Sequence, residues 1–397
     1  MHKNIKKNLI IFNLTRFFYG FLPLKVFLVL YFQELTGSLK LAMGIFSIQY
    51  LTIMFLEIPM SVLSDKWSRK MVLILSSLCY ILTYVFWIGA YYSYSYTLLV
   101  VGAILWGIGF ALYSGSYDAT LYETCQEGRK KFYKIFAKSS GYFHLSAGIS
   151  AVLGGIIAYR WGYIYCAYGN LIALTCFCIL FLFLIEPKRT KSNTHHFIKE
   201  TKEIFEHVRR TKPLRILAIP YFLNMGIADS IERFESSLYI GYFSNWVLGI
   251  LRLVREWSAM VGFWFSKKII KNFGYAKTLL TSEALIIIFQ FLALLINTIL
   301  TPFIFVMTRF FIGTGYPVEK QLQQDHFLDE KRATMDSLLS IGASASIALF
   351  SFILGWIAEA TTPLIAMLFV ISLRPISLFF FAYLFKILAL PQEQHKK

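Results

Sequence analysis

The sequence predicts an all-α polytopic membrane protein in which twelve transmembrane helices form two pseudo-symmetric halves of six helices each. Of its 397 residues, 57% are hydrophobic and 15% are charged, whereas a soluble protein is typically about 45–50% apolar and about 25% charged. Apolar stretches long enough to cross a bilayer recur along the chain, and the two halves share a repeat. These properties exclude a soluble enzyme, a disordered tail and a nucleic-acid-binding module.

Each span is predicted from an apolar stretch between turn residues, because a hydrocarbon core of about 30 Å needs about 20 apolar residues per helix. The predicted spans are 8–34, 42–63, 70–92, 96–122, 138–160, 163–185, 214–241, 245–267, 276–297, 301–325, 333–357 and 362–388. The first stretch is too long for the apolar region of a signal peptide, so we expect it to be retained.

The longest loop between spans is polar and basic and divides the chain into six spans plus six. We therefore predict an N-terminal six-helix bundle at 1–186 and a cytoplasmic linker at 187–213. The second six-helix bundle, with a cytoplasmic tail, is predicted at 214–397.

The basic residues predict the orientation of the spans. Lys and Arg number 39 against 22 Asp and Glu, which gives a net charge of +17. With the N-terminus in the cytoplasm, about 29 of the basic residues lie in the tails and loops on that side. Only Lys40 and Arg160 lie outside. This distribution predicts that both termini are cytoplasmic, and it explains the net charge without a nucleic-acid partner. We expect the protein to lie in a bacterial inner (plasma) membrane.

A repeat relates the two halves. The loops at 64–74 and 270–280 follow the second and the eighth predicted span, and they are separated by 206 residues. The same offset superimposes two glycine pairs, Gly107 and Gly109 on Gly313 and Gly315. Parallel halves of this kind are typical of transporters whose substrate site lies between the halves near the membrane midplane.

The loop after the second span reads Ser61-Val-Leu-Ser-Asp65-Lys66-Trp-Ser68-Arg69-Lys70. It resembles the signature G-x-x-x-D-[RK]-x-G-[RK]-[RK] of the major facilitator superfamily, and serines replace both glycines of that signature. The matching charged residues are Asp65, Lys66, Arg69 and Lys70. Through its topology the resemblance covers the whole chain, and it implies a secondary active transporter that moves a small organic solute by alternating access.

The resemblance further implies that this loop forms a cytoplasmic latch between the halves. Asp65 would cap the start of the eleventh span near residues 333–334, since a carboxylate at a helix N-terminus is favourable by about 0.3–1 kcal/mol. Arg69 would pair with an acid at the cytoplasmic end of the fourth span, either Asp118 or Glu123. An ordinary solvated turn is the alternative.

Other segments resemble an efflux-like branch of the same superfamily, whose members mostly export drugs or metabolites. These segments are 57–59, 114–123 and 331–335. The antiporter motif of the fifth span is incomplete, because its glycines are present without the proline that ends the family pattern. This departure leaves uptake open as an alternative to efflux.

Charged residues inside the spans predict a site of proton coupling. Each costs about 2.5–3.5 kcal/mol near a helix centre, so each needs a partner or a watery cavity. Asp229 and Arg233 lie four residues apart and can neutralise each other. Glu232 has no such partner in its own span, so we expect it to pair with Arg255 and to be the coupling acid. Further candidates for proton coupling are Asp229, Asp118 and Glu57. A purely structural network is the alternative.

Basic and aromatic side chains in the spans are candidates for substrate contact, because aromatic faces bind apolar and cationic organic molecules. The candidates are Arg16, Asn13, Tyr113, Tyr117, Tyr142, Tyr221, Arg255 and Arg309. Glu283 and Arg374 are instead expected to be structural partners, because the resemblance places the ninth and twelfth spans at the periphery.

The predicted function is proton-coupled efflux of a drug-like or amphipathic compound. Proton-coupled uptake or export of a polar metabolite, such as a siderophore, an amino acid or a sugar, is the alternative. A membrane-embedded enzyme is disfavoured because no HExxH, GxSxG, HxxxxD or DxxD motif is present. A channel is disfavoured by the repeat. We expect a monomer in the lipid bilayer, with a small-molecule substrate and protons as partners and with neither cofactor nor metal.

Overall fold

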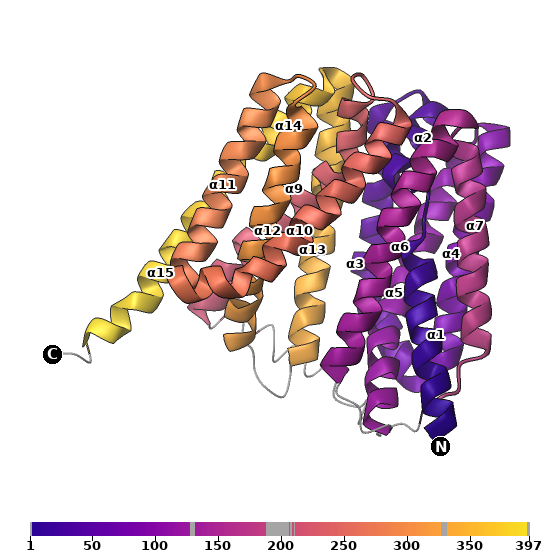
Figure 1. The fold of residues 1–397 in the computed structure, drawn as a ribbon, viewed down its shortest axis with the longest axis horizontal. Coiled ribbons are helices and arrows are strands. Elements are labelled where there is room, and N and C mark those ends of the chain that lie inside the picture. Colours follow the sequence, from indigo (N-terminus) through magenta and orange to yellow (C-terminus); the bar gives the residue numbers. More distant parts are fainter. Residues whose placement is uncertain are drawn as a thin grey trace. The chain divides into compact units, whose positions relative to one another are not determined.

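A computed structural model describes residues 2–127, 132–187, 206, 209, 211–326 and 332–394, and the regular structure of these residues is helical (Figure 1). Within them, ten candidate spans are long and apolar enough to cross a membrane. Two further helices, α10 (Asn245–Phe273) and α12 (Thr301–Asp325), have sufficient length and carry more charged residues. Together these twelve segments confirm the predicted fold class.

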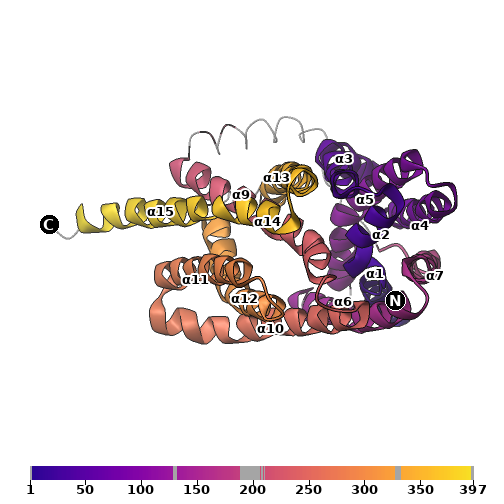
Figure 2. The ribbon, with the colours of Figure 1, turned by 90° about the horizontal axis from the view of Figure 1, so that it is seen from above.

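The chain forms two compact units, Met1–His195 with Phe243–Leu253 and His196–Tyr242 with Val254–Lys397. Most of the predicted linker 187–213 lies outside the described residues. The helices of unit 1 are α1 (His2–Gly20), α2 (Leu28–Thr36), α3 (Leu39–Lys66), α4 (Arg69–Ser93), α5 (Tyr96–Glu127), α6 (Phe132–Arg160) and α7 (Tyr163–Leu182). Within this unit α4 packs along α5 and α7, α3 packs along α5, and α1 packs along α6 (Figure 2).

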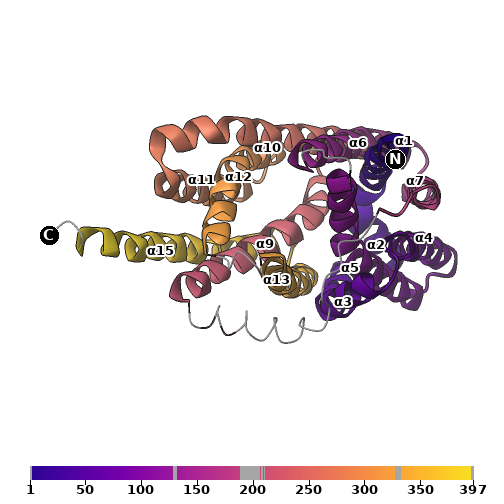
Figure 3. The same cartoon turned by 90° about the horizontal axis from the view of Figure 1, so that it is seen from below.

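Unit 2 contains the other helices and most of α10. Besides α12 they are α9 (Lys212–Tyr239), α11 (Tyr275–Ile296), α13 (Arg332–Ala360), α14 (Pro363–Ser372) and α15 (Pro375–Gln394). Within this unit α11 lies beside α12, and α9 packs against α13 and α15 (Figure 3).

The first predicted span is a broken helix. Its helix α1 ends at Gly20, a 3-10 turn covers Lys25–Phe27, and α2 begins at Leu28. Pro23 at the break has no backbone N–H to donate. The N–H of Leu24 donates to Oδ1 of Asn170 on α7 at 3.0 Å, and this bond satisfies a backbone group that the break exposes. Pro23 by itself indicates a break in the helix, whereas nothing in the sequence shows that Asn170, 146 residues after Leu24, pairs with the exposed N–H.

Pro23 lies against two glycines with different amounts of room. A Cβ atom at Gly154 on α6 would lie 2.3 Å from the carbonyl oxygen of Pro23, whereas one at Gly169 on α7 would lie 3.4 Å from its ring. We expect Gly154→Ala to destabilise the protein by about 1–3 kcal/mol, the usual cost of overpacking. Gly169→Ala, the matched control, should leave the melting temperature in detergent unchanged. Equal melting temperatures for the two variants would contradict this account of the break.

The repeat predicted between the halves is present in the packing of the fourth and tenth spans. A Cβ atom at Gly107 on α5 would lie 2.6 Å from Thr52 on α3, the second span. At Gly313 on α12 it would lie 2.4 Å from the carbonyl oxygen of Ala259 on α10, the eighth span. Each glycine therefore allows its helix to approach the corresponding neighbour in its own unit.

The second glycine pair of the repeat faces the third and ninth spans in the same manner. Gly109 lies close to Ser76 on α4, and a Cβ atom there would be 3.1 Å from the serine carbonyl oxygen. Gly315 lies close to Ser282 on α11, and a Cβ atom at Gly315 would be 3.1 Å from the Cβ atom of the serine. Ser76 and Ser282 are themselves separated by 206 residues. The repeat in the sequence is therefore a repeat of helix contacts.

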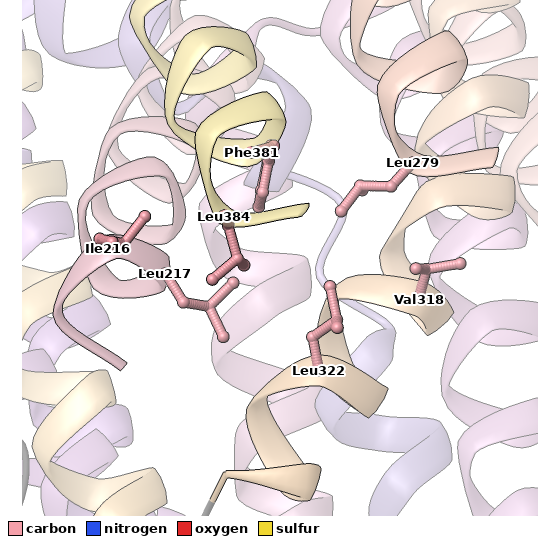
Figure 4. Packing of buried hydrophobic residues seen from close by; sticks show 7 residues of the cluster. All are labelled: Ile216, Leu217, Leu279, Val318, Leu322, Phe381 and Leu384. Carbon is pink, nitrogen blue, oxygen red and sulfur yellow. The ribbon is translucent and has the colours of Figure 1, made fainter. Parts of the chain in front are cut away.

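One apolar cluster joins four helices of unit 2 (Figure 4). Its buried members are Ile216, Leu217, Leu279, Val318, Leu322, Phe381 and Leu384. Burying one side chain of this kind contributes about 1.5–3 kcal/mol. The cluster fixes α12 against α9, α11 and α15, and thereby fixes the rotation of α12 at Glu319, which follows Val318.

Candidate functional site

Arg16 in unit 1 lies among aromatic side chains and forms an ion pair. Its Nη2 atom lies 3.3 Å from Oδ1 of Asp118 on α5. Its guanidinium carbon lies 4.3 Å from the ring centroid of Tyr117, 5.8 Å from that of Tyr113 and 5.9 Å from that of Phe136. Three of the residues predicted to contact substrate, Arg16, Tyr113 and Tyr117, therefore lie together.

Several polar atoms around Arg16 are buried without a hydrogen-bond partner in the described part of the chain. They are Oδ1 of Asn13, the hydroxyl of Tyr113 and Nε of Arg16. The hydroxyl of Tyr117, in contrast, donates to the carbonyl oxygen of Phe12 at 3.0 Å. Because most buried polar atoms in proteins are paired, unpaired donors and acceptors beside an ion pair are positions at which a ligand can bind.

Other predicted residues lie outside this group. Tyr142 is half-buried on α6, and none of the rings around Arg16 belongs to it. Glu57 is buried on α3, two residues before Pro59. Tyr221 belongs to unit 2, where it lines a separate cavity.

The charged loop, residues 65–70, covers the end of α3, the turn at 67–68 and the start of α4. Its Arg69 pairs with one of the two acids that the sequence predicted. Nη2 of Arg69 lies 3.6 Å from Oε1 of Glu123, and its Nη1 donates to Oγ of Ser64 at 2.9 Å. Arg69 therefore pairs with Glu123, while Asp118 pairs with Arg16. The side chains of Asp65 and Lys66 and of residues 333–334 lie outside the described residues, so the capping of the eleventh span stays a prediction.

Glu186, which no pattern in the sequence indicated, binds the same charged loop. The hydroxyl of Ser68 donates to one oxygen of its carboxylate, and the backbone N–H of Arg69 donates to the other at 2.8 Å. Lys70 donates to the carbonyl oxygen of Leu182 at 2.7 Å. A carboxylate at a helix N-terminus pairs free N–H groups and complements the helix dipole. Glu186 thus caps α4 and ties the end of the sixth span to the charged loop.

Four charged residues in unit 2 connect three helices. Glu232 on α9 contacts Arg309 on α12, and its Oε2 lies 3.7 Å from Nη2 of Arg255 on α10. Arg255 also pairs with Glu235. The predicted pair of Glu232 with Arg255 is therefore present. Arg255 and Arg309, both predicted as substrate contacts, belong to this network.

The predicted pair within α9 is present as well. Nε of Arg233 lies 2.7 Å from Oδ2 of Asp229 one helical turn away. Both partners lie on the same helix, so this pair can persist when the neighbouring helices move. The ion pairs of Glu232, in contrast, depend on the positions of α10 and α12.

A cavity of about 70 Å³ lies in unit 2 between α9, α11, α12 and the break between α14 and α15. Polar side chains in its wall are Tyr221, Asn224, Glu283, Tyr316, Glu319 and Arg374. Nε of Arg374 lies 3.6 Å from Oε2 of Glu283, and Nδ2 of Asn224 donates to the other oxygen at 3.1 Å. Glu319, which the sequence analysis left unassigned, is 7% exposed.

Comparison with known proteins identifies the family. The sequence model of the Major Facilitator Superfamily matches residues 9–318. Over 336 residues the chain is 25% identical to the uncharacterized MFS-type transporter YxaM of Bacillus subtilis (strain 168), and the match covers 80% of each chain. The uncharacterized MFS-type transporter MJ1317 of Methanocaldococcus jannaschii is 30% identical over 155 residues, which cover 38% of this chain and 36% of that protein.

Solved structures show the same fold. A structure of the nucleoside transporter NupG has a TM-score of 0.78 and 14% identity, covering 96% of this chain and 99% of that one. The D-xylose-proton symporter has a TM-score of 0.79 and 11% identity, covering 95% and 97%. The chain therefore belongs to the major facilitator superfamily, and it is a multi-pass membrane protein that acts as a secondary transporter of a small solute and not as an enzyme.

Proposed function

We propose that this transporter is a proton-coupled exporter of a drug-like or amphipathic organic compound, as in the efflux branch that its sequence resembles. The observation that carries the proposal is the aromatic surrounding of Arg16, where three rings lie within 6 Å of the guanidinium. Tyr113 also stacks on Tyr19 with ring centroids 4.7 Å apart. Such faces bind apolar and cationic organic molecules. The buried oxygen atoms of Asn13 and Tyr113 that lack a hydrogen-bond partner among the described residues would orient the polar end of such a substrate.

The pair of Arg16 with Asp118 supports a second candidate, the transport of a polar metabolite such as an amino acid, a siderophore or a sugar. The Asp118 side chain is 52% exposed, so the pair offers one charge of each sign to a ligand. The two candidates differ in the chemistry they require at the rings, because only the amphipathic compound needs stacking on Tyr113 and Tyr117.

Glu232 is the coupling acid in this proposal, with Asp229, Asp118 and Glu57 as the other candidates. Protonation of Glu232 would remove the negative charge that contacts Arg309 and Arg255, and would thereby loosen α9 from α10 and α12. A carboxylate whose partners belong to other helices changes its surroundings when those helices move. Such a change couples proton binding to alternating access.

The charged loop completes the proposed mechanism as a cytoplasmic latch. Asp65 would cap the eleventh span, and Lys66 and Lys70 would add positive charge at the cytoplasmic surface. Arg69 and its partner Glu123 would hold the loop in place. The proposal also includes cytoplasmic termini, a bacterial inner membrane and a monomeric state.

Thiol labelling tests the substrate contact in a variant whose five native cysteines are replaced by alanine. N-ethylmaleimide should label Arg16→Cys and Tyr113→Cys, and ethidium, an amphipathic cation, should slow that labelling several-fold. Tyr122→Cys is the matched control, because Tyr122 lies nine residues after Tyr113 and hence on the opposite face of the same helix. Protection by a mixture of amino acids instead of ethidium would favour the polar metabolite. Labelling that neither probe slows would move the substrate site away from Arg16.

A further inference from the structure

The carboxylate of Glu319 is a buried acid of unit 2 that the proposed mechanism does not use. It lies on α12 with 7% exposure, and its Oε1 atom is buried without a hydrogen-bond partner in the described part of the chain. The neighbouring Val318 is fully buried in the apolar cluster, which fixes the rotation of the helix. Glu319 points into the protein, where it lines the cavity, although an ionised side chain at this depth costs about 2.5–3.5 kcal/mol.

The nearby basic side chains are matched by other acids. Arg374 pairs with Glu283 at 3.6 Å, and its Nη1 donates to Gln290 at 3.1 Å. Lys320, the residue after Glu319, pairs with Asp336 on α13 at 3.3 Å. The charges of these two ion pairs, Arg374 with Glu283 and Lys320 with Asp336, neutralise each other. The carboxylate of Glu319 adds one negative charge that neither pair neutralises.

The cavity beside Glu319 has room for a small ligand and presents acceptors to it. Its volume of about 70 Å³ exceeds the roughly 10–15 Å³ that one water molecule requires. Oδ1 of Asn224, which lines the same wall, is also buried without a partner among the described residues. Two unpaired oxygen acceptors, one of them a carboxylate, need a donor or a positive charge.

We propose that Glu319 binds a monovalent cation, a proton or a sodium ion, in this cavity. Tyr221, Phe311 and Tyr316 line the cavity, and surroundings of low dielectric constant strengthen the attraction between a carboxylate and a cation. The site is distinct from the network of Glu232, because Asn224 and Glu232 are eight residues apart on α9, about 12 Å along the helix. The repeat places Tyr113 at the equivalent position of unit 1, so the carboxylate is a feature of unit 2 alone.

Carbodiimide labelling of the wild-type protein tests the proposal directly. Dicyclohexylcarbodiimide reacts with protonated carboxyl groups in apolar surroundings, and peptide mass spectrometry locates the product. In purified protein in detergent with potassium as the only metal cation, we expect labelling of Glu319 at pH 6 and a several-fold decrease at pH 9. Glu283, which lines the same cavity and pairs with Arg374, is the internal control and should stay unlabelled.

Sodium distinguishes the two cations. If sodium chloride at pH 6 lowers the labelling and potassium chloride does not, the site binds sodium in competition with the proton. If neither salt has an effect, the proton is the ligand. Labelling of Glu319 that is the same at pH 6 and pH 9, with and without sodium, would overturn the proposal.

A second measurement covers the case in which the reagent does not reach the cavity. The melting temperature of the wild type should change with pH or with sodium, and Glu319→Gln should lose that part of the change because glutamine carries no charge. Glu359→Gln, an exposed acid of α13, is the control and should melt like the wild type. The same pH and sodium dependence in Glu319→Gln and the wild type, together with absent labelling, would also overturn the proposal. Neither measurement involves solute transport, so a failure of the proposed function would leave this result standing.

Discussion

Replacing Glu232 with glutamine is expected to abolish accumulation of substrate driven by a pH gradient, while exchange of substrate across the membrane continues. Glutamine keeps the size of the side chain and removes the charge that contacts Arg309 and Arg255. The variant can no longer gain and lose a proton at this position, so the step linked to pH disappears. Uphill transport and exchange of ethidium in proteoliposomes measure the two effects separately.

Asp229→Asn is the matched control for Glu232→Gln. It neutralises an acid on the same helix, three residues away, whose partner Arg233 is also on α9. Because this pair does not depend on another helix, we expect uphill transport to retain its pH dependence. If Glu232→Gln also accumulates substrate with unchanged pH dependence, the charges of α9 are structural and Asp118 becomes the coupling candidate.

Replacing Arg374 with methionine is expected to cause the largest loss of stability in unit 2. Arg374 is 2% exposed, and its removal leaves the carboxylate of Glu283 buried without its cation. Loss of one partner from a buried ion pair typically costs about 3–5 kcal/mol. Glu319 lines the same cavity, so two carboxylates would then share it without a guanidinium. The melting temperature in detergent and the yield of folded protein measure the effect.

A second substitution separates loss of charge from loss of packing at Arg374. The double variant Arg374→Met with Glu283→Gln removes both charges of the pair and should be more stable than Arg374→Met alone. Arg233→Met is the control for removing an arginine from a pair, because Arg233 and Asp229 are 20% and 28% exposed and water can solvate the remaining acid. Equal melting temperatures of the single and the double variant would show that packing, and not the charge of Glu283, determines the loss.

The fold could be predicted from the sequence because the bilayer imposes the same requirement on every span. Apolar length gave all twelve spans, and a constant offset gave the glycine contacts of α5 and α12. Short-range charge patterns were also informative, since Asp229 and Arg233 are one helical turn apart. The pair of Glu232 with Arg255 could be predicted because neither residue has an oppositely charged residue three or four positions away along the chain.

The remaining features depend on contacts between residues that are distant in the sequence. The break in the first span is held by Asn170, and the charged loop is held by Glu186, which lies 117 residues after Arg69. Glu283 and Arg374 were each expected to have a structural role, but nothing in the sequence shows that they pair with one another or that they border a cavity. Hydropathy identifies an acid within an apolar span, such as Glu319, as unusual. That its Oε1 atom has no hydrogen-bond partner among the described residues can be seen only in the structure, because the neighbouring helices surround it.

The direction of proton movement during transport decides whether this protein is a proton-coupled exporter. Proteoliposomes containing the full chain and the entrapped pH dye pyranine are mixed with ethidium, with other amphipathic compounds and with polar metabolites. An antiporter releases protons from the lumen as substrate enters, whichever way the protein is inserted. We expect the internal pH to rise with an amphipathic compound in wild-type liposomes and to stay constant in liposomes with Glu232→Gln. Entry of substrate into wild-type liposomes without any change of internal pH would contradict this expectation.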